Sequence, residues 1–157
     1  MRFEHLIEIN DPGLEYLRPL TRAQVWTGLM HRVEDARPFL PGLETCEILS
    51  RGPGWADRRL DFGAVQMIDR ATWDPGKSVC FDAVPGADHR SGQLCITIEE
   101  PEIGHLFLRF SYQTEAAAGL VEDDARYEAF LRQAYEAADM DTVSVIRLLA
   151  QATGSAT

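Results

Sequence analysis

The C-terminal part of the chain constrains the fold most. From about Glu122 to Gln151 the sequence holds no proline or glycine and is rich in alanine, glutamate, arginine and leucine. Because proline and glycine are the residues that most destabilise a helix interior, this composition predicts one helix over 122–151, roughly 45 Å long. A helix of this length needs a partner surface against which its apolar side can be buried.

One side of the expected helix is mostly apolar when residues are placed about 100° apart. The middle of that side carries two small side chains, Ala134 and Ala138. Small residues there either let the helix approach its partner closely or leave a hollow beneath it, and the sequence leaves both open. The stripe consists of Tyr127, Leu131, Ala134, Ala138, Thr142, Val145 and Leu149, with Arg132, Glu136 and Arg147 on the opposite side.

The preceding residues alternate between apolar and polar in the manner of β-strands. A first strand is expected over 2–9, helical structure over 21–40, and successive strands over 43–113. Thr21 and Gln24 have the spacing of a capping box at a helix start. Short turns between strands indicate an antiparallel sheet with one buried face, although the strand register between 57 and 73 stays open.

This order of elements predicts a single α+β domain over 1–157. The simplest packing lays the long helix across a twisted sheet that curls around it. A chain of 157 residues has the length of one domain, since domains contain about 100–200 residues.

Composition excludes several classes of protein. The chain has 25 acidic and 15 basic residues, a net charge of −10, which disfavours binding to nucleic acids or anionic membranes. No apolar run approaches the roughly 20 residues that cross a bilayer. The residues that follow Met1 include charged side chains where a signal peptide would have an apolar segment, so we expect no signal peptide. We therefore expect neither a nucleic-acid nor a membrane partner.

Cysteine and histidine patterns predict no metal site and no cofactor. The three cysteines, Cys46, Cys80 and Cys95, form no CxxC pair and are expected to be reduced thiols, consistent with a cytoplasmic protein. His31, Glu34 and Asp35 share one helix face, which we interpret as a solvated surface rather than a metal site.

Several segments resemble a known superfamily. They are Phe3-Glu4-His5-Leu6, the stretch from Leu20 to Leu43 with Val25-Trp26-Thr27-Gly28-Leu29 and Phe39-Leu40-Pro41-Gly42-Leu43, Ile98-Glu99-Glu100-Pro101-Glu102, Leu106-Phe107-Leu108-Arg109-Phe110, and Gln133-Ala134-Tyr135. Together they resemble the SRPBCC superfamily, the helix-grip fold of START domains and birch-pollen-allergen-like proteins. Within it, the chain is most similar to the group named for the acetylaranotin-biosynthesis L protein.

The resemblance implies a curved, seven-stranded antiparallel sheet that grips the C-terminal helix, often around a deep apolar cavity. Members of the superfamily bind lipids, sterols, polyketides or aromatic metabolites, and some are cyclases or dehydratases. The group itself brings no established catalytic residues, so none is assigned here, and the chain contains no GxSxG or phosphate-binding loop motif.

The favoured hypothesis is binding of a small hydrophobic or aromatic metabolite between sheet and C-terminal helix. One alternative is a polyketide cyclase or dehydratase, and another is an interaction domain with a filled core and no ligand. Candidate polar contacts are His105, Arg109 and Asp141, for which simple solvent exposure is the competing interpretation. The expected pocket lining is Phe62, Phe81, Ile96, Leu108, Phe110, Tyr112, Ala134, Ala138 and Thr142.

Overall fold

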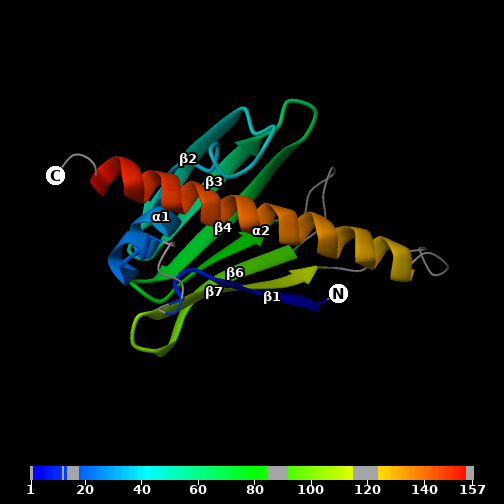
Figure 1. The fold of residues 1–157 in the computed structure, drawn as a ribbon. Helices are drawn as coiled ribbons and strands as arrows, with labels where there is room; N and C mark the ends of the chain where they lie inside the picture. Colours follow the sequence, from blue (N-terminus) through cyan, green and yellow to red (C-terminus); the bar gives the residue numbers. More distant parts are fainter. Residues whose placement is uncertain (1, 12, 14–17, 85–91, 115–123, 155–157) are drawn as a thin grey trace.

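The computed structural model describes residues 2–11, 13, 18–84, 92–114 and 124–154. The chain alternates one long run of strands with two helices (Figure 1). The elements are β1 (Arg2–Glu8), α1 (Arg22–Glu34), β2 (Thr45–Gly52), β3 (Trp55–Asp61), β4 (Gln66–Asp74), β5 (Ser78–Ala83), β6 (Gly92–Glu102), β7 (His105–Thr114) and α2 (Asp124–Gly154).

The strands form one seven-stranded antiparallel sheet in the order β1-β7-β6-β5-β4-β3-β2. Neighbours in sequence are neighbours in the sheet except β1, which pairs with β7. Helix α2 runs across one face of the sheet, and α1 lies beside the C-terminal end of α2 (Figure 1). The predicted α+β helix-grip architecture is therefore confirmed. We call the sheet face that meets the helices the inner face.

The register of β3 against β4, which the sequence left open between residues 57 and 73, follows from the turn at Gly63. Its φ of 89° lies in the left-handed region that glycine adopts without steric cost. This turn places Arg58 opposite Asp69 and Asp57 opposite Arg70. Because side chains alternate between faces, the first pair points inward and the second outward.

The start of α1 has the predicted capping box. The Gln24 amide donates to Thr21 Oγ1 at 3.1 Å, and the Thr21 amide donates to Gln24 Oε1 at 2.8 Å. The helical structure predicted over 21–40 ends earlier than expected, because α1 stops at Glu34 and residues 37–42 form turns. These turns bring Phe39, which is 1% exposed, back into the core.

Helix α2 is rotated by about one residue from the predicted phase, or about 100°. Ala134 is exposed, whereas Asp139, Thr142 and Ile146 are buried. The side chain of Tyr127 lies outside the described residues. The predicted stripe was right at Thr142, which is fully buried, and wrong at Ala134. It missed Asp139, a buried charged residue that hydropathy does not select. No helix among the described residues is both long and apolar enough to cross a membrane.

Two of the three cysteines form a disulfide, which corrects the expectation of reduced thiols. Cys80 on β5 and Cys95 on β6 are direct partners across the sheet, with Cα atoms 4.1 Å apart, and their sulfurs are bonded. Cys46 is free. A spacing of 15 residues carries no motif, so only the strand register brings these two thiols together.

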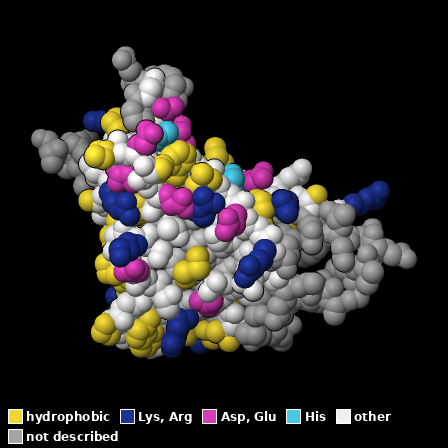
Figure 2. All heavy atoms as spheres, turned by 90° about the horizontal axis from the view of Figure 1, so that it is seen from below, with side chains coloured by type: hydrophobic (Ala, Val, Ile, Leu, Met, Phe, Trp, Pro, Cys, Tyr) yellow, Lys and Arg dark blue, Asp and Glu magenta, His cyan; other side chains and the backbone are white. Residues whose placement is uncertain are grey.

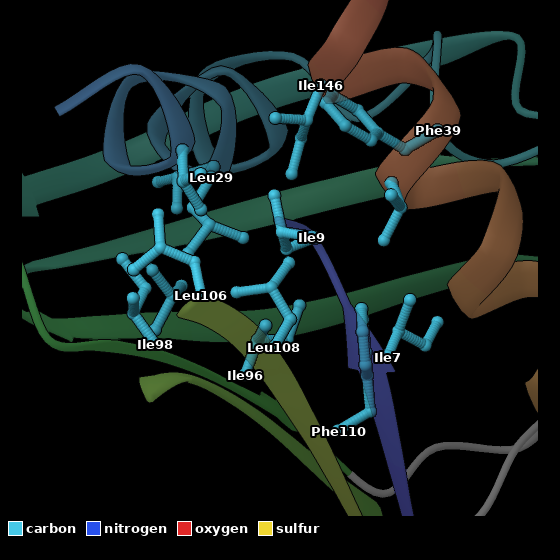
Figure 3. Packing of buried hydrophobic residues seen from close by; sticks show 14 of the residues in the cluster. Ile7, Ile9, Leu29, Phe39, Ile96, Ile98, Leu106, Leu108, Phe110 and Ile146 are labelled. Atoms are coloured by element: carbon cyan, nitrogen blue, oxygen red, sulfur yellow. The ribbon is translucent and has the colours of Figure 1, made fainter. Parts of the chain in front are cut away.

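The core is filled at the end of the sheet beneath α1 and the C-terminal half of α2. Ile96, Leu108 and Phe110 are all 0% exposed and pack with Leu29 and Ile146 from the two helices (Figure 3). Figure 3 shows these side chains pointing toward one another from both layers. These close contacts hold the helices against the sheet.

Candidate functional site

The other end of the same interface is hollow. A cavity of about 280 Å³ lies between the inner face and α2. Leu94 on β6 and Tyr112 on β7 are cross-strand partners, and both border this cavity. The following pairs on the inner face of the same strands lie in the filled core; they are Ile96–Phe110 and Ile98–Leu108. The lining consists of Arg32, Leu40, Arg58, Leu60, Phe62, Met67, Asp69, Phe81, Ala83, Gly92, Gln93, Leu94, Tyr112, Thr114 and Tyr135.

Aromatic rings form much of the cavity wall. The rings of Tyr112 on β7 and Tyr135 on α2 stack with centroids 4.0 Å apart and planes 9° apart. Phe81 reaches the cavity from β5, and Phe62 from the residue that follows β3. Aromatic rings on several sides of a cavity favour the binding of a flat, apolar small molecule.

A buried ion pair forms the wall on the β3–β4 side. Arg58 donates from Nε to Asp69 Oδ1 at 2.8 Å and from Nη2 to Oδ2 at 2.6 Å. Its Nη1 donates to the carbonyl oxygens of Arg32 at 2.8 Å and Val33 at 3.1 Å. These bonds satisfy both charges and tie the last turn of α1 to the sheet.

A second arginine in the wall has fewer partners. Arg32, on the last turn of α1, donates from Nη1 to Thr142 Oγ1 on α2 at 2.5 Å. Its guanidinium carbon lies 5.3 Å from the centroid of the Phe81 ring and 6.0 Å from that of Phe39. Burial lowers the pKa of Arg32, since removal from water penalises the cation.

A third polar group lies beneath α2. The Tyr112 hydroxyl donates to Asp139 Oδ1, and His5 Nδ1 lies 3.1 Å from Asp139 Oδ2. Burial raises the pKa of Asp139, although its bonds to Tyr112 and His5 oppose that shift. Burial and the Asp139 carboxyl together raise the pKa of Tyr112, so the tyrosine stays a hydrogen-bond donor. The three side chains form a connected proton-bearing network at the cavity's edge.

The structure distributes the predicted lining residues over three environments. Phe62, Phe81 and Tyr112 border the cavity. Thr142 is fully buried and meets the wall through Arg32. Ala138 is half-buried and Ala134 exposed, so neither alanine borders the cavity. Ile96, Leu108 and Phe110 belong to the filled core.

The polar contacts expected from the sequence lie elsewhere. His105 Nε2 is 2.8 Å from a Glu8 carboxylate oxygen, and Arg109 pairs with Glu4 and Glu99, all on the outer face of the sheet. Asp141 is exposed on α2. Figure 2 shows basic and acidic side chains interspersed over one face of the molecule, as such surface pairs require.

Sequence reasoning missed the polar half of the site. Arg58 alternates with the inward residues Ala56 and Leu60, and Arg32 falls on the α1 stripe of Val25 and Leu29. Both patterns were available as a signal. Hydropathy does not select such positions, since charged residues are rarely buried.

Among the described residues, no cluster of three or more histidine, cysteine or acidic side chains could hold a metal ion. At the helix face singled out in the sequence, Glu34 pairs with Arg51 at 2.5 Å and Asp35 with Arg37 at 2.7 Å.

A family model named acetylaranotin biosynthesis cluster protein L matches residues 7–153. The chain belongs to this family. No curated protein sequence matches it.

Solved structures with the same fold include two aromatase/cyclases. The di-domain aromatase/cyclase StfQ from the steffimycin biosynthetic pathway has a TM-score of 0.71 at 12% identity, over 98% of this chain and 51% of that one. The chain thus spans about half the length of that di-domain protein. The aromatase/cyclase Zhui from Streptomyces sp. R1128 has a TM-score of 0.61 at 19% identity, over 96% and 93% of the two chains. Ara h 8.0201 has a TM-score of 0.58 at 13% identity, over 93% and 97%. At these identities the likeness establishes the fold.

Proposed function

We propose that the protein binds a small hydrophobic or aromatic metabolite in the cavity between the sheet and α2. The observation that carries this proposal is a pocket of about 280 Å³ between the sheet and α2 whose wall contains the rings of Phe62, Phe81, Tyr112 and Tyr135. A concave site of about this size, lined by aromatic side chains and a few polar groups, is the usual form of a small-molecule binding site. It also counts against the alternative of a filled-core interaction domain.

The size of the cavity limits the ligand. Pockets for drug-sized molecules measure about 300–1,000 Å³, so a cavity of about 280 Å³ suits a molecule of one or two rings. 2-Ethylnaphthalene is therefore a suitable neutral probe, and calorimetric titration gives its affinity.

A cavity-blocking substitution tests the location. Ala83 lines the cavity from β5, so Ala83→Trp should fill it and abolish binding of 2-ethylnaphthalene, while the far-UV circular dichroism stays native. The matched control is Ala134→Trp, since Ala134 is exposed on α2. Unchanged binding in a folded Ala83→Trp variant would contradict this site. Native mass spectrometry of protein from its own host would then identify any natural ligand.

A second candidate function is cyclisation or dehydration of a polyketide-like substrate. The observation that favours it is the network of Tyr112, Asp139 and His5, because loss of water with aromatisation needs groups that accept and donate protons. The aromatase/cyclase relatives of the same fold support the same direction. 3-Hydroxy-1-tetralone, which becomes 1-naphthol on losing water, is a substrate of suitable size. The wild-type protein should accelerate this loss and Asp139→Asn should not; a rate equal to that in buffer would remove this candidate.

A further inference from the structure

Arg32 is a buried cation with most of its hydrogen-bonding capacity unused. A guanidinium carries five N–H donors. Among the described residues, the guanidinium makes one hydrogen bond, from Nη1 to Thr142 Oγ1, and no described carboxylate oxygen lies within 4.0 Å of it. Arg32 is nevertheless only 8% exposed. Since Arg32 lines the cavity, its remaining donors face that cavity rather than the outer surface of the protein.

The neighbouring Arg58 shows how this protein satisfies a buried guanidinium when the partner is internal. All three of its nitrogens donate to Asp69 or to backbone carbonyls. The difference between the two arginines follows from their surroundings. Arg58 faces an aspartate across the sheet, whereas Arg32 faces the cavity that both residues line.

The two buried carboxylates nearby are already engaged. Asp69 accepts both bonds from Arg58, and Asp139 is bonded by Tyr112 and lies beside His5. Both act on Arg32 electrostatically from a distance but give it no hydrogen bond. The Phe39 and Phe81 rings near the guanidinium likewise accept no conventional hydrogen bond.

We propose that the ligand of this cavity is a small aromatic molecule that carries an anionic oxygen group, a carboxylate or an acidic phenolate, and that Arg32 binds this group. The inference rests on the proposed binding function and specifies its ligand class. An anionic oxygen group accepts two parallel N–H bonds from a guanidinium, which relieves the cost of burying the cation. The aromatic part then lies among the rings of Phe62, Phe81 and Tyr112.

Two probes of the same shape separate the charge from the ring. 2-Naphthoate carries the carboxylate, and 2-ethylnaphthalene replaces it by an apolar group. Arg32→Met should weaken 2-naphthoate binding by about 10- to 100-fold, the range expected for hydrogen bonds to a charged group, and leave 2-ethylnaphthalene almost unchanged. Arg109→Met is the matched control, because that arginine lies on the outer face of the sheet.

A measurement on the wild-type protein keeps the test independent of how the variant folds. The Nε–Hε resonance of Arg32, observed by ¹⁵N NMR and assigned with Arg32→Lys, should shift on addition of 2-naphthoate and stay in place with 2-ethylnaphthalene. Binding of both probes with the same affinity, unchanged by Arg32→Met and without that resonance shift, would overturn the role of Arg32 and leave the binding function standing. Binding of neither probe would overturn the binding function itself.

Discussion

At the scale of single residues, strands β3 and β4 carry two Arg–Asp ion pairs that differ in burial. Arg58–Asp69 and Asp57–Arg70 are adjacent rungs of the same ladder, and both are bidentate ion pairs. The side chains of Arg58 and Asp69 are 3% and 5% exposed, whereas those of Arg70 and Asp57 are 51% and 27% exposed. The geometry of the two ion pairs is the same, and their main difference is burial, together with the backbone carbonyls that Arg58 also binds.

Removing the inner carboxylate should be far more costly than removing the outer one. Asp69→Ala leaves Arg58 buried without its counter-charge, and we expect the free energy of unfolding to fall by about 3–5 kcal/mol. Asp57→Ala breaks an exposed pair and should cost about 0–1 kcal/mol. Urea unfolding of both variants measures the difference, and equal costs would show that the inner pair is more hydrated than its exposure indicates.

These polar residues mark how far the sequence could predict the site. Alternation along β3 predicts that Arg58 shares a face with Ala56 and Leu60, but only the register with β4 provides the partner that makes its burial tolerable. The aromatic lining was easier to predict, because Phe62, Phe81 and Tyr112 follow the apolar pattern of their strands. Polar lining depends on contacts between distant residues, and periodicity carries no information about those.

At the scale of elements, α1 and α2 touch through a glycine. A Cβ atom added at Gly28 would lie 2.7 Å from Cγ1 of Ile146, closer than carbon atoms can approach. The absence of a side chain therefore sets the distance between the helices. Ile146 is 1% exposed, and its Cγ2 and Cβ atoms also lie within 2.8 and 3.1 Å of the added atom, so rotation of one methyl group would not relieve the contact.

Gly28→Ala should consequently destabilise the protein, although alanine is the better helix former. Overpacking a core contact costs about 1–3 kcal/mol, which exceeds the gain of about 0.5–1 kcal/mol from helix propensity. Thr27→Ala, at an exposed position of the same helix, should change the free energy of unfolding by less than about 0.5 kcal/mol. Thermal unfolding compares the two, and an unchanged or higher midpoint for Gly28→Ala would mean that the helices separate freely.

The phase of α2 shows why an element is easier to predict than its orientation. The lack of proline and glycine predicts the helix over 122–151, close to the observed Asp124–Gly154. Hydropathy then placed Ala134 and Ala138 inward, whereas the helix turns Asp139 inward because Tyr112 and His5 provide hydrogen-bond partners for its carboxyl group. A buried aspartate lowers the apolar character of the face that carries it. One such residue is enough for the hydropathy pattern to predict the wrong buried face of the helix.

At the scale of the whole molecule, the order of elements and the family resemblance predicted the curled sheet and its gripped helix. They could not predict which part of the interface between sheet and helices is closely packed and which part contains a cavity. Whether a hollow remains depends on summed side-chain volumes across five strands and two helices, and a shift of one residue in α2 changes that sum. The structure resolves the question by position: α1 and the C-terminal half of α2 cover a packed core, and the cavity lies toward the N-terminal half of α2.

Two leucines on the inner face test this division. Leu108 is 0% exposed in the packed core, and Leu94 borders the cavity on the neighbouring strand. Leu108→Ala opens a new void among fixed neighbours and should lower the free energy of unfolding by about 2–5 kcal/mol. Leu94→Ala enlarges a space that already exists and loses fewer contacts, so its cost should fall below this range.

The comparison is decisive because both substitutions delete the same atoms from the same sheet. Urea unfolding with unchanged m-values would assign the difference to the folded state rather than to the unfolded chain. Equal costs for the two variants would mean that the interior is uniformly packed, and the case for a ligand would then lose its physical basis. A smaller cost at Leu94, together with tighter or unchanged binding of 2-ethylnaphthalene, would mean that this end of the fold gives up packing energy to keep a binding space open.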